Sequence, residues 1–98
     1  MTAALDVLVL DVGDAVRGYD CRDVLRVEET DEDSSRGRYV VRLGRLGAPR
    51  DVRCREILGS VALTARDIRP VPPALRDRME GEKPWAVGIT ERGICLLY

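Results

Sequence analysis

Histidine is absent from this chain of 98 residues. Imidazole is the usual base beside a serine or cysteine nucleophile and a common zinc ligand, so its absence excludes Ser–His and Cys–His pairs, zinc hydrolases and phosphotransfer through imidazole. Carboxylate pairs remain as acids and bases, but one group of acidic residues crowds a polar run that is typical of a solvated loop, namely Glu28, Glu29, Asp31, Glu32 and Asp33. We therefore predict no catalytic residues. An enzyme that uses Asp23 or Glu56 is only the third hypothesis.

Cysteine is scarce and is not arranged for metal binding. Cys21, Cys54 and Cys95 are odd in number, form no CxxC motif, and have no histidine to help them hold a metal ion. Their spacing predicts reduced thiols that act as small buried hydrophobic side chains. We expect neither a metal nor a cofactor.

The chain also lacks an excess of charge and any long apolar run. Sixteen basic residues stand against seventeen acidic ones, so no overall field favours nucleic acid or anionic lipid. No apolar stretch is long enough to cross a bilayer, and Met1–Leu10 lacks the basic and apolar regions of a signal peptide. These absences predict a cytoplasmic protein with no nucleic-acid partner and no membrane insertion.

One stretch of sequence occurs twice. Residues 15–25 (AVRGYDCRDVL) are echoed thirty-three positions later by residues 48–58 (APRDVRCREIL), with Ala, Arg, Cys, Arg and Leu identical at matching places. A repeat of this length indicates two similar strand-turn-strand units that share one core. The alternative is chance in a chain rich in Arg and Asp. In the first interpretation Cys21, Val24 and Leu25 contribute to the core as Cys54, Ile57 and Leu58 do.

Most of the apolar segments have the composition and spacing of β-strands. The predicted strands are Leu5–Val12, Arg38–Leu43, Ala48–Arg53, Ile57–Leu63, Trp85–Ile89 and Ile94–Tyr98. Both faces of the first are expected to be buried, and the last two form a hairpin around Thr90–Gly93. Tyr19–Val27 fits either one helical turn or a bent strand. Six or seven short strands favour a mostly β fold, a small closed or nearly closed barrel.

The remaining segments are predicted to connect the strands. Glu28–Gly37 is predicted to be a mobile loop, and Thr64–Ile68 has the Thr and Asp spacing that caps a short helical turn. Arg69–Pro73 must run extended because proline disfavours helix in the residue before it, and Ala74–Pro84 reads as a long exposed excursion. Arg42, Arg45, Arg50, Arg53 and Arg55 are expected near one another, either as a surface for an acidic partner or as a solvated face.

The segment Leu63-Thr64-Ala65-Arg66-Asp67-Ile68-Arg69-Pro70-Val71-Pro72-Pro73 is followed by the glycine-containing hairpin Gly88–Leu97. With these segments the second half of the chain, from about Tyr39 to Tyr98, resembles the C-terminal half of the CheW family, the adaptor proteins of bacterial chemosensory arrays. Leu8–Asp14 is similar to the family's first strand and turn, and Asp20–Leu25 to the element that follows. The resemblance implies a single domain, residues 1–98, with the family's SH3-type β-barrels in abbreviated form and one short helical turn. Between the two matching parts, family members carry further segments where this chain has only Glu28–Gly37. Part of one barrel is therefore expected to be missing.

The resemblance implies a function in chemotaxis and motility signalling. The first hypothesis is a cytoplasmic adaptor without an active site, which binds the cytoplasmic tip of a chemoreceptor and has lost normal docking of the histidine kinase. Other array proteins of the CheW and CheA type are further expected partners. The residues proposed for partner binding are Val24, Val41, Ile57, Leu58 and Trp85, any of which fits the core equally well.

The second hypothesis is a stand-alone SH3-like binding module of another cytoplasmic system, which uses Trp85 and the Pro70–Pro73 edge. A truncated barrel also leaves strand edges without partners, and such an edge is either blunted by charge or covered by another chain. We therefore predict a weak homodimer.

Overall fold

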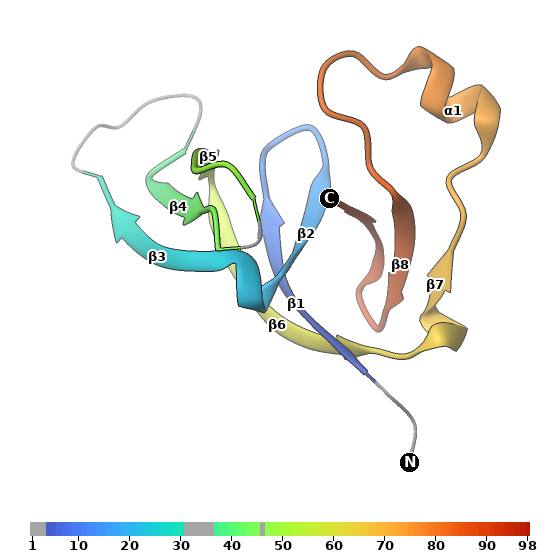
Figure 1. Ribbon diagram of the computed structural model, residues 1–98, viewed down its shortest axis with the longest axis horizontal. Helices are drawn as coiled ribbons and strands as arrows, with labels where there is room; N and C mark the ends of the chain where they lie inside the picture. The colour runs from blue at the N-terminus through green and yellow to red at the C-terminus, as the bar shows by residue number, and fades with distance from the viewer. Residues whose placement is uncertain (1–3, 31–36, 46) are drawn as a thin grey trace.

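The computed structural model describes residues 4–30, 37–45 and 47–98. Within these ranges the chain forms two β-sheets. The larger sheet has the strand order β6 (Glu56–Leu63), β1 (Leu5–Asp11), β2 (Val16–Asp20), β9 (Gly93–Leu97), β8 (Ala86–Thr90) and β7 (Ile68–Arg69). The smaller sheet has the order β3 (Val24–Glu29), β4 (Tyr39–Leu43) and β5 (Arg50–Cys54). The predicted mostly β class is confirmed (Figure 1).

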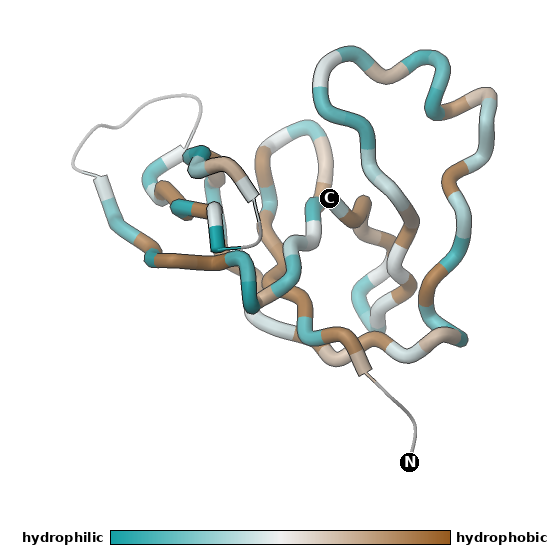
Figure 2. Tube along the Cα trace, in the orientation of Figure 1, coloured by the Kyte–Doolittle hydropathy of each residue, from teal (hydrophilic) through white to brown (hydrophobic). Residues whose placement is uncertain are grey.

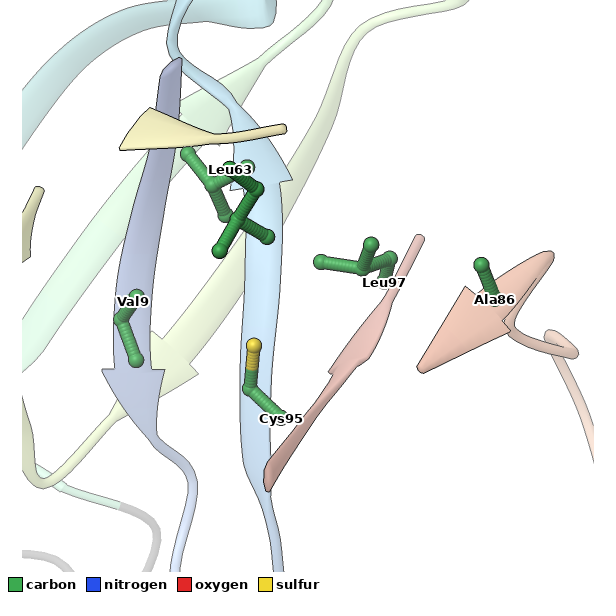
Figure 3. Packing of buried hydrophobic residues seen from close by; sticks show 6 residues of the cluster. Val9, Leu63, Ala86, Cys95 and Leu97 are labelled. Atoms are coloured by element: carbon green, nitrogen blue, oxygen red, sulfur yellow. The ribbon is translucent and has the colours of Figure 1, made fainter. Parts of the chain in front are cut away.

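Strand β1 lies between β2 and β6 and is packed on both faces. Val7 and Val9 belong to a first hydrophobic cluster, which β6, β8 and β9 complete with Leu63, Ala86, Cys95 and Leu97 (Figure 3). Leu8 and Leu10 pack into a second cluster, whose other buried members are Tyr19, Val41, Leu43 and Cys54. Successive side chains of a strand point to opposite faces. The continuous apolar run from Val7 to Leu10 therefore makes β1 a wall shared by two cores.

The repeated sequence falls at the two places where the chain passes from one sheet to the other. In the first copy, β2 of the larger sheet leads through the 3₁₀ turn η1 (Cys21–Asp23) into β3 of the smaller sheet. In the second copy, β5 of the smaller sheet leads through Arg55 into β6 of the larger one. The Arg55 N–H donates to the Asp11 carbonyl at 2.7 Å and fixes this corner on β1. Both copies are therefore strand-corner-strand units, run in opposite directions.

The two copies do not match in burial. Cys54 is fully buried, whereas Cys21 is only half-buried in η1. Leu25 is 51% exposed, so the prediction that it mirrors Leu58 as a core residue is wrong. The physical reason is its place on β3, which within the described ranges is an end strand of the smaller sheet and pairs with β4 alone.

The predicted hairpins are present. Arg38–Leu43 and Ala48–Arg53, predicted as the two arms of one hairpin, supply β4 and β5, and the other hairpin consists of β8 and β9. The pairing of β1 with β2 was not predicted. Gly13 makes the turn between these two strands at φ +105°, with its N–H donating to Asp11 Oδ1 at 2.8 Å. The 3₁₀ turn η2 (Ala65–Asp67) begins where expected, because the Thr64 N–H donates to Asp67 Oδ2 at 2.9 Å. Tyr19–Val27 contains both of the alternatives left open, a 3₁₀ turn followed by a strand.

Two predicted connections are more regular than expected. Glu28 and Glu29 extend β3 and pair with Val40 and Tyr39, so the predicted loop starts later; Asp31, Glu32 and Asp33 lie outside the described residues. The predicted exposed excursion contains a short helix, α1 (Pro73–Arg78), which begins at a proline suited to the first helical turn. The described chain thus has two 3₁₀ turns and one helix in place of one helical turn. No helix in the described ranges has the length and apolarity to cross a membrane.

Candidate docking grooves

The first groove, here called the junction groove, lies where the two sheets meet and has a volume of about 670 Å³. Its apolar lining comes from β1, β9, the β4–β5 turn and Trp85, and its polar lining comes from the end of β2, from η1, from β5 and from Glu82. The lining residues are Leu5, Val7, Gly18, Asp20, Arg22, Asp23, Gly47, Ala48, Pro49, Arg50, Glu82, Trp85, Leu97 and Tyr98. Trp85 is 52% exposed in this groove. An apolar groove with an accessible indole and a charged rim has the composition of a protein-binding site.

The backbone holds Trp85 in place although its side chain is half exposed. Its N–H donates to the Leu97 carbonyl at 2.8 Å, and the preceding Pro84 is fully buried. Across the same groove, Arg50 Nη1 of β5 lies 2.8 Å from Glu82 Oε1 of the segment before β8. This ion pair links the smaller sheet to the end of the larger one.

A stack of aromatic and guanidinium groups supports one wall of the junction groove. The rings of Tyr19 and Tyr98 stack at 5.8 Å between centroids with 25° between their planes. The Arg17 guanidinium lies 4.6 Å from the Tyr98 ring centre, and the Arg50 guanidinium 5.9 Å from that of Tyr19. Burial raises the pKa of Tyr19, which keeps the phenol neutral. Tyr98 is thereby held by contacts with both Tyr19 and Arg17 as part of the groove wall.

Asp20 organises the η1 rim of the junction groove. Its Oδ1 accepts the Arg22 backbone N–H at 2.9 Å, and its Oδ2 lies 2.9 Å from Arg22 Nη2. The hydrogen bond from the Arg22 side chain lowers the pKa of this carboxyl group. Asp20 is therefore ionised at neutral pH and serves as the N-cap of η1.

A second groove, here called the hairpin groove, lies between β6 and the β8–β9 hairpin and has a volume of about 770 Å³. Leu58, Val61 and the cross-strand pair Ile89 and Ile94 line it, with polar groups around them. Ile94 is 66% and Ile89 42% exposed. The hairpin groove is thus a separate apolar surface over the first cluster.

The five residues predicted to bind a partner do not form one surface. Trp85 lies in the junction groove and Leu58 in the hairpin groove. Val24 and Ile57 are partly buried against the second cluster. Val41 is fully buried, because β4 is the middle strand of the smaller sheet and Val41 faces the core, so its assignment to partner binding is corrected.

The sequence alone does not identify several of the residues that line the two grooves. Tyr98 was assigned only to a strand, yet it shares the junction groove with Trp85. The exposure of Ile89 and Ile94 follows from strand alternation, because their neighbours Gly88 and Cys95 point into the first cluster and form the next cross-strand pair. In the sequence, the alternation of side chains between the two faces of this hairpin is the signal that predicts their exposure.

The other candidate groups have structural partners. Burial raises the pKa of the Cys54 and Cys95 thiols, and the described residues contain no group of three or more Cys, Asp or Glu side chains placed to hold a metal ion. Two of the clustered arginines form ion pairs, Arg50 with Glu82 and Arg42 Nη1 with Asp51 Oδ1 at 3.3 Å.

A comparison of the chain with protein-family models and with curated proteins finds no match. The resemblance to the CheW family therefore rests on the sequence segments quoted above.

Proposed function

We propose that the protein is a cytoplasmic, non-catalytic adaptor of a bacterial chemosensory array, and that the junction groove binds the cytoplasmic tip of a chemoreceptor. The observation that carries the proposal is the half-exposed Trp85 next to Tyr98 in an apolar groove. Tryptophan and tyrosine are the side chains most enriched among residues that dominate binding energy. The resemblance to the CheW family supplies the kind of partner.

The shape and charge of the junction groove suit a helical segment with an apolar stripe. Leu5, Trp85 and Tyr98 offer accessible apolar contact area, and the Arg50–Glu82 pair and η1 place charges of both signs at the rim. Helices bind such grooves through residues spaced three and four positions apart. Charges at the rim select orientation more than they add affinity.

The proposal includes loss of normal kinase docking. The residues that line the junction groove come from both sheets, so the groove does not depend on the smaller sheet alone. The smaller sheet has three strands, and the sequence between the two CheW-like parts is shortened at this sheet. A contact that depends on the family's missing segments is therefore the one expected to be lost.

Isothermal titration against a receptor tip and against a kinase regulatory domain, each alone, tests the proposal. We expect binding to the receptor tip only. Trp85→Ala should weaken it at least 30-fold, corresponding to a loss of about 2 kcal/mol. Leu75→Ala is the matched control, because Leu75 is also an exposed apolar side chain (42%) but lies on α1 outside both grooves. Tight kinase binding without receptor binding would contradict the proposal.

A second function has its own observation. The same groove places Trp85 and Tyr98 near the carboxylates of Asp20, Asp23 and Glu82. Proline-rich peptides bind aromatic-lined grooves, and carboxylates attract a basic residue beside the prolines. This favours a stand-alone SH3-like module, although none of Pro70–Pro73 lines the groove. Titration with an arginine-flanked proline-rich peptide separates the two functions, because an adaptor for a receptor tip should not bind it.

A further inference from the structure

Strand β3 has an open edge on the smaller sheet. Among the described residues it pairs with β4 and with no other strand. Its apolar side chains are accessible, with Leu25 51% and Val27 43% exposed. Figure 2 shows hydrophobic stretches along β3, which end in a hydrophilic stretch. An edge of this kind pairs with another strand unless something blocks it.

The backbone of β3 determines which residues offer hydrogen bonds at that edge. The Thr30 N–H donates to the Arg38 carbonyl at 2.6 Å, so Thr30 points its backbone groups toward β4. In an antiparallel ladder the direction alternates from one residue to the next. Since the register from Glu29 to Arg26 is unbroken, Glu28 and Arg26 also face β4, whereas Val27 and Glu29 present their N–H and C=O groups outward.

The apolar Val27 and its charged neighbours Arg26 and Glu28 lie on opposite faces of the smaller sheet. Val27 is opposite Val41, which is fully buried, so Val27 continues the row that faces the second cluster. Arg26 and Glu28 share the other face, where Arg26 Nη2 lies 3.2 Å from Glu28 Oε1. These two side chains are 64% and 54% exposed, and they are accessible to a strand placed alongside.

A second copy of β3 fits this edge in one register. When two copies of β3 pair antiparallel about a two-fold axis, the axis can pass through Arg26, Val27 or Glu28. In each of these three registers the outward-facing N–H and C=O groups of one copy lie opposite those of the other. Centring on Arg26 sets two arginines directly opposite each other, and centring on Glu28 sets two glutamates opposite. Like charges in directly opposed positions are destabilising. Centring on Val27 instead places Arg26 opposite Glu28 of the second copy, twice over.

We propose that two copies of the protein associate through β3, antiparallel, with Val27 opposite Val27 of the second copy. The smaller sheets then join into one sheet of six strands, and the row Val52, Val41, Val27 continues into its symmetry mate. The interface is isologous, as a two-fold dimer requires. It involves neither groove and therefore goes beyond the proposed adaptor function.

Charge exchange tests this interface in the full chain. Arg26→Glu leaves glutamates at both positions 26 and 28, and Glu28→Arg leaves arginines at both. Like charges then lie opposite each other in the dimer, so each single variant should dimerise at least tenfold more weakly than the unchanged chain in analytical ultracentrifugation. An equimolar mixture of the two variants should form a heterodimer, because every opposed pair is then Glu with Arg. The double variant R26E/E28R should dimerise like the unchanged chain, since the pairs are restored in the Val27-centred register only.

Controls of equal charge change are available away from β3. Lys83→Glu and Glu80→Arg lie between α1 and β8, on exposed positions, and should leave dimerisation unchanged. Circular dichroism of each variant shows whether the monomer is folded. A chain that stays monomeric up to millimolar concentration overturns the proposal. A dimer that neither single variant weakens also overturns it, and a double variant that fails to dimerise overturns the register. None of these outcomes depends on receptor binding.

Discussion

Substitution of Gly18 by alanine is expected to destabilise the first cluster. Gly18 lies on β2 where its Cα faces the side chains of β1 and β9. A Cβ added there would lie 2.6 Å from Val7 Cγ1 and 2.9 Å from Leu97 Cδ2. Carbon atoms in contact prefer about 3.5–4.0 Å, so both side chains would have to withdraw. Val7 and Leu97 are themselves fully buried and have little room to do so.

The magnitude follows from two opposing effects. Overpacking of a well-filled core costs about 1–3 kcal/mol. Replacing a strand glycine by alanine recovers about 0.5–1 kcal/mol through the smaller loss of backbone entropy. Because the added Cβ would lie only 2.6 Å from Val7 Cγ1, the overpacking cost falls in the upper part of its range, about 2–3 kcal/mol, and the net loss in the free energy of unfolding is about 1–2.5 kcal/mol. For a domain of this size such a loss lowers Tm by about 5–10 °C.

Urea unfolding followed by circular dichroism measures this change. Gly47→Ala is the control, because an added Cβ meets nothing within 4 Å there and φ is not positive; it should stay within about 0.5 kcal/mol of the unchanged chain. Val7→Ala combined with Gly18→Ala should cost less than the sum of the single changes, since the closest clash is removed. A Gly18→Ala chain as stable as the unchanged protein would refute the reasoning.

Two further predictions concern titratable groups. Asp20→Ala should lower the free energy of unfolding by about 1 kcal/mol at neutral pH, because the N-cap of η1 is lost. The pKa of Asp20 is lowered in the folded chain, so the stability difference between the variant and the unchanged chain should shrink below about pH 4 as this carboxyl group protonates. Equal losses of stability at pH 7 and pH 2 would contradict this prediction. Alkylation followed by mass spectrometry should modify half-buried Cys21 first, with buried Cys54 and Cys95 reacting only as the fold opens; equal rates for all three thiols would contradict it.

The strands and hairpins could be predicted because their patterns are local. The run from Val7 to Leu10 indicated a strand buried on both faces, and β1 is packed between two clusters. Thr64 and Asp67 indicated η2 through a capping interaction only three residues long. For η2 the stabilising contact itself joins residues close in sequence. For β1 only the apolar run is local, because the residues that it packs against, such as Leu63 and Leu97, are distant in sequence.

The burial of individual residues was less predictable because it depends on strand order. Val41 and Val27 are both valines on neighbouring strands and lie directly opposite each other, yet one is fully buried and the other 43% exposed. Only the position of β3 at the end of the smaller sheet separates them. That position follows from non-local pairing, which the alternation within a strand does not encode. Glu28 likewise joins a strand because Val40 pairs with it.

The place of the repeat in the fold gives its two copies a shared structural role. Half of the residues that line the junction groove belong to the two copies, with Gly18, Asp20, Arg22 and Asp23 from the first and Ala48, Pro49 and Arg50 from the second. Each copy carries the chain from one sheet to the other, so both corners are forced to the place where the sheets meet. Two similar corners run in opposite directions therefore build one groove from its two sides. The duplicated sequence is not a duplicated binding site, because a single groove requires both copies.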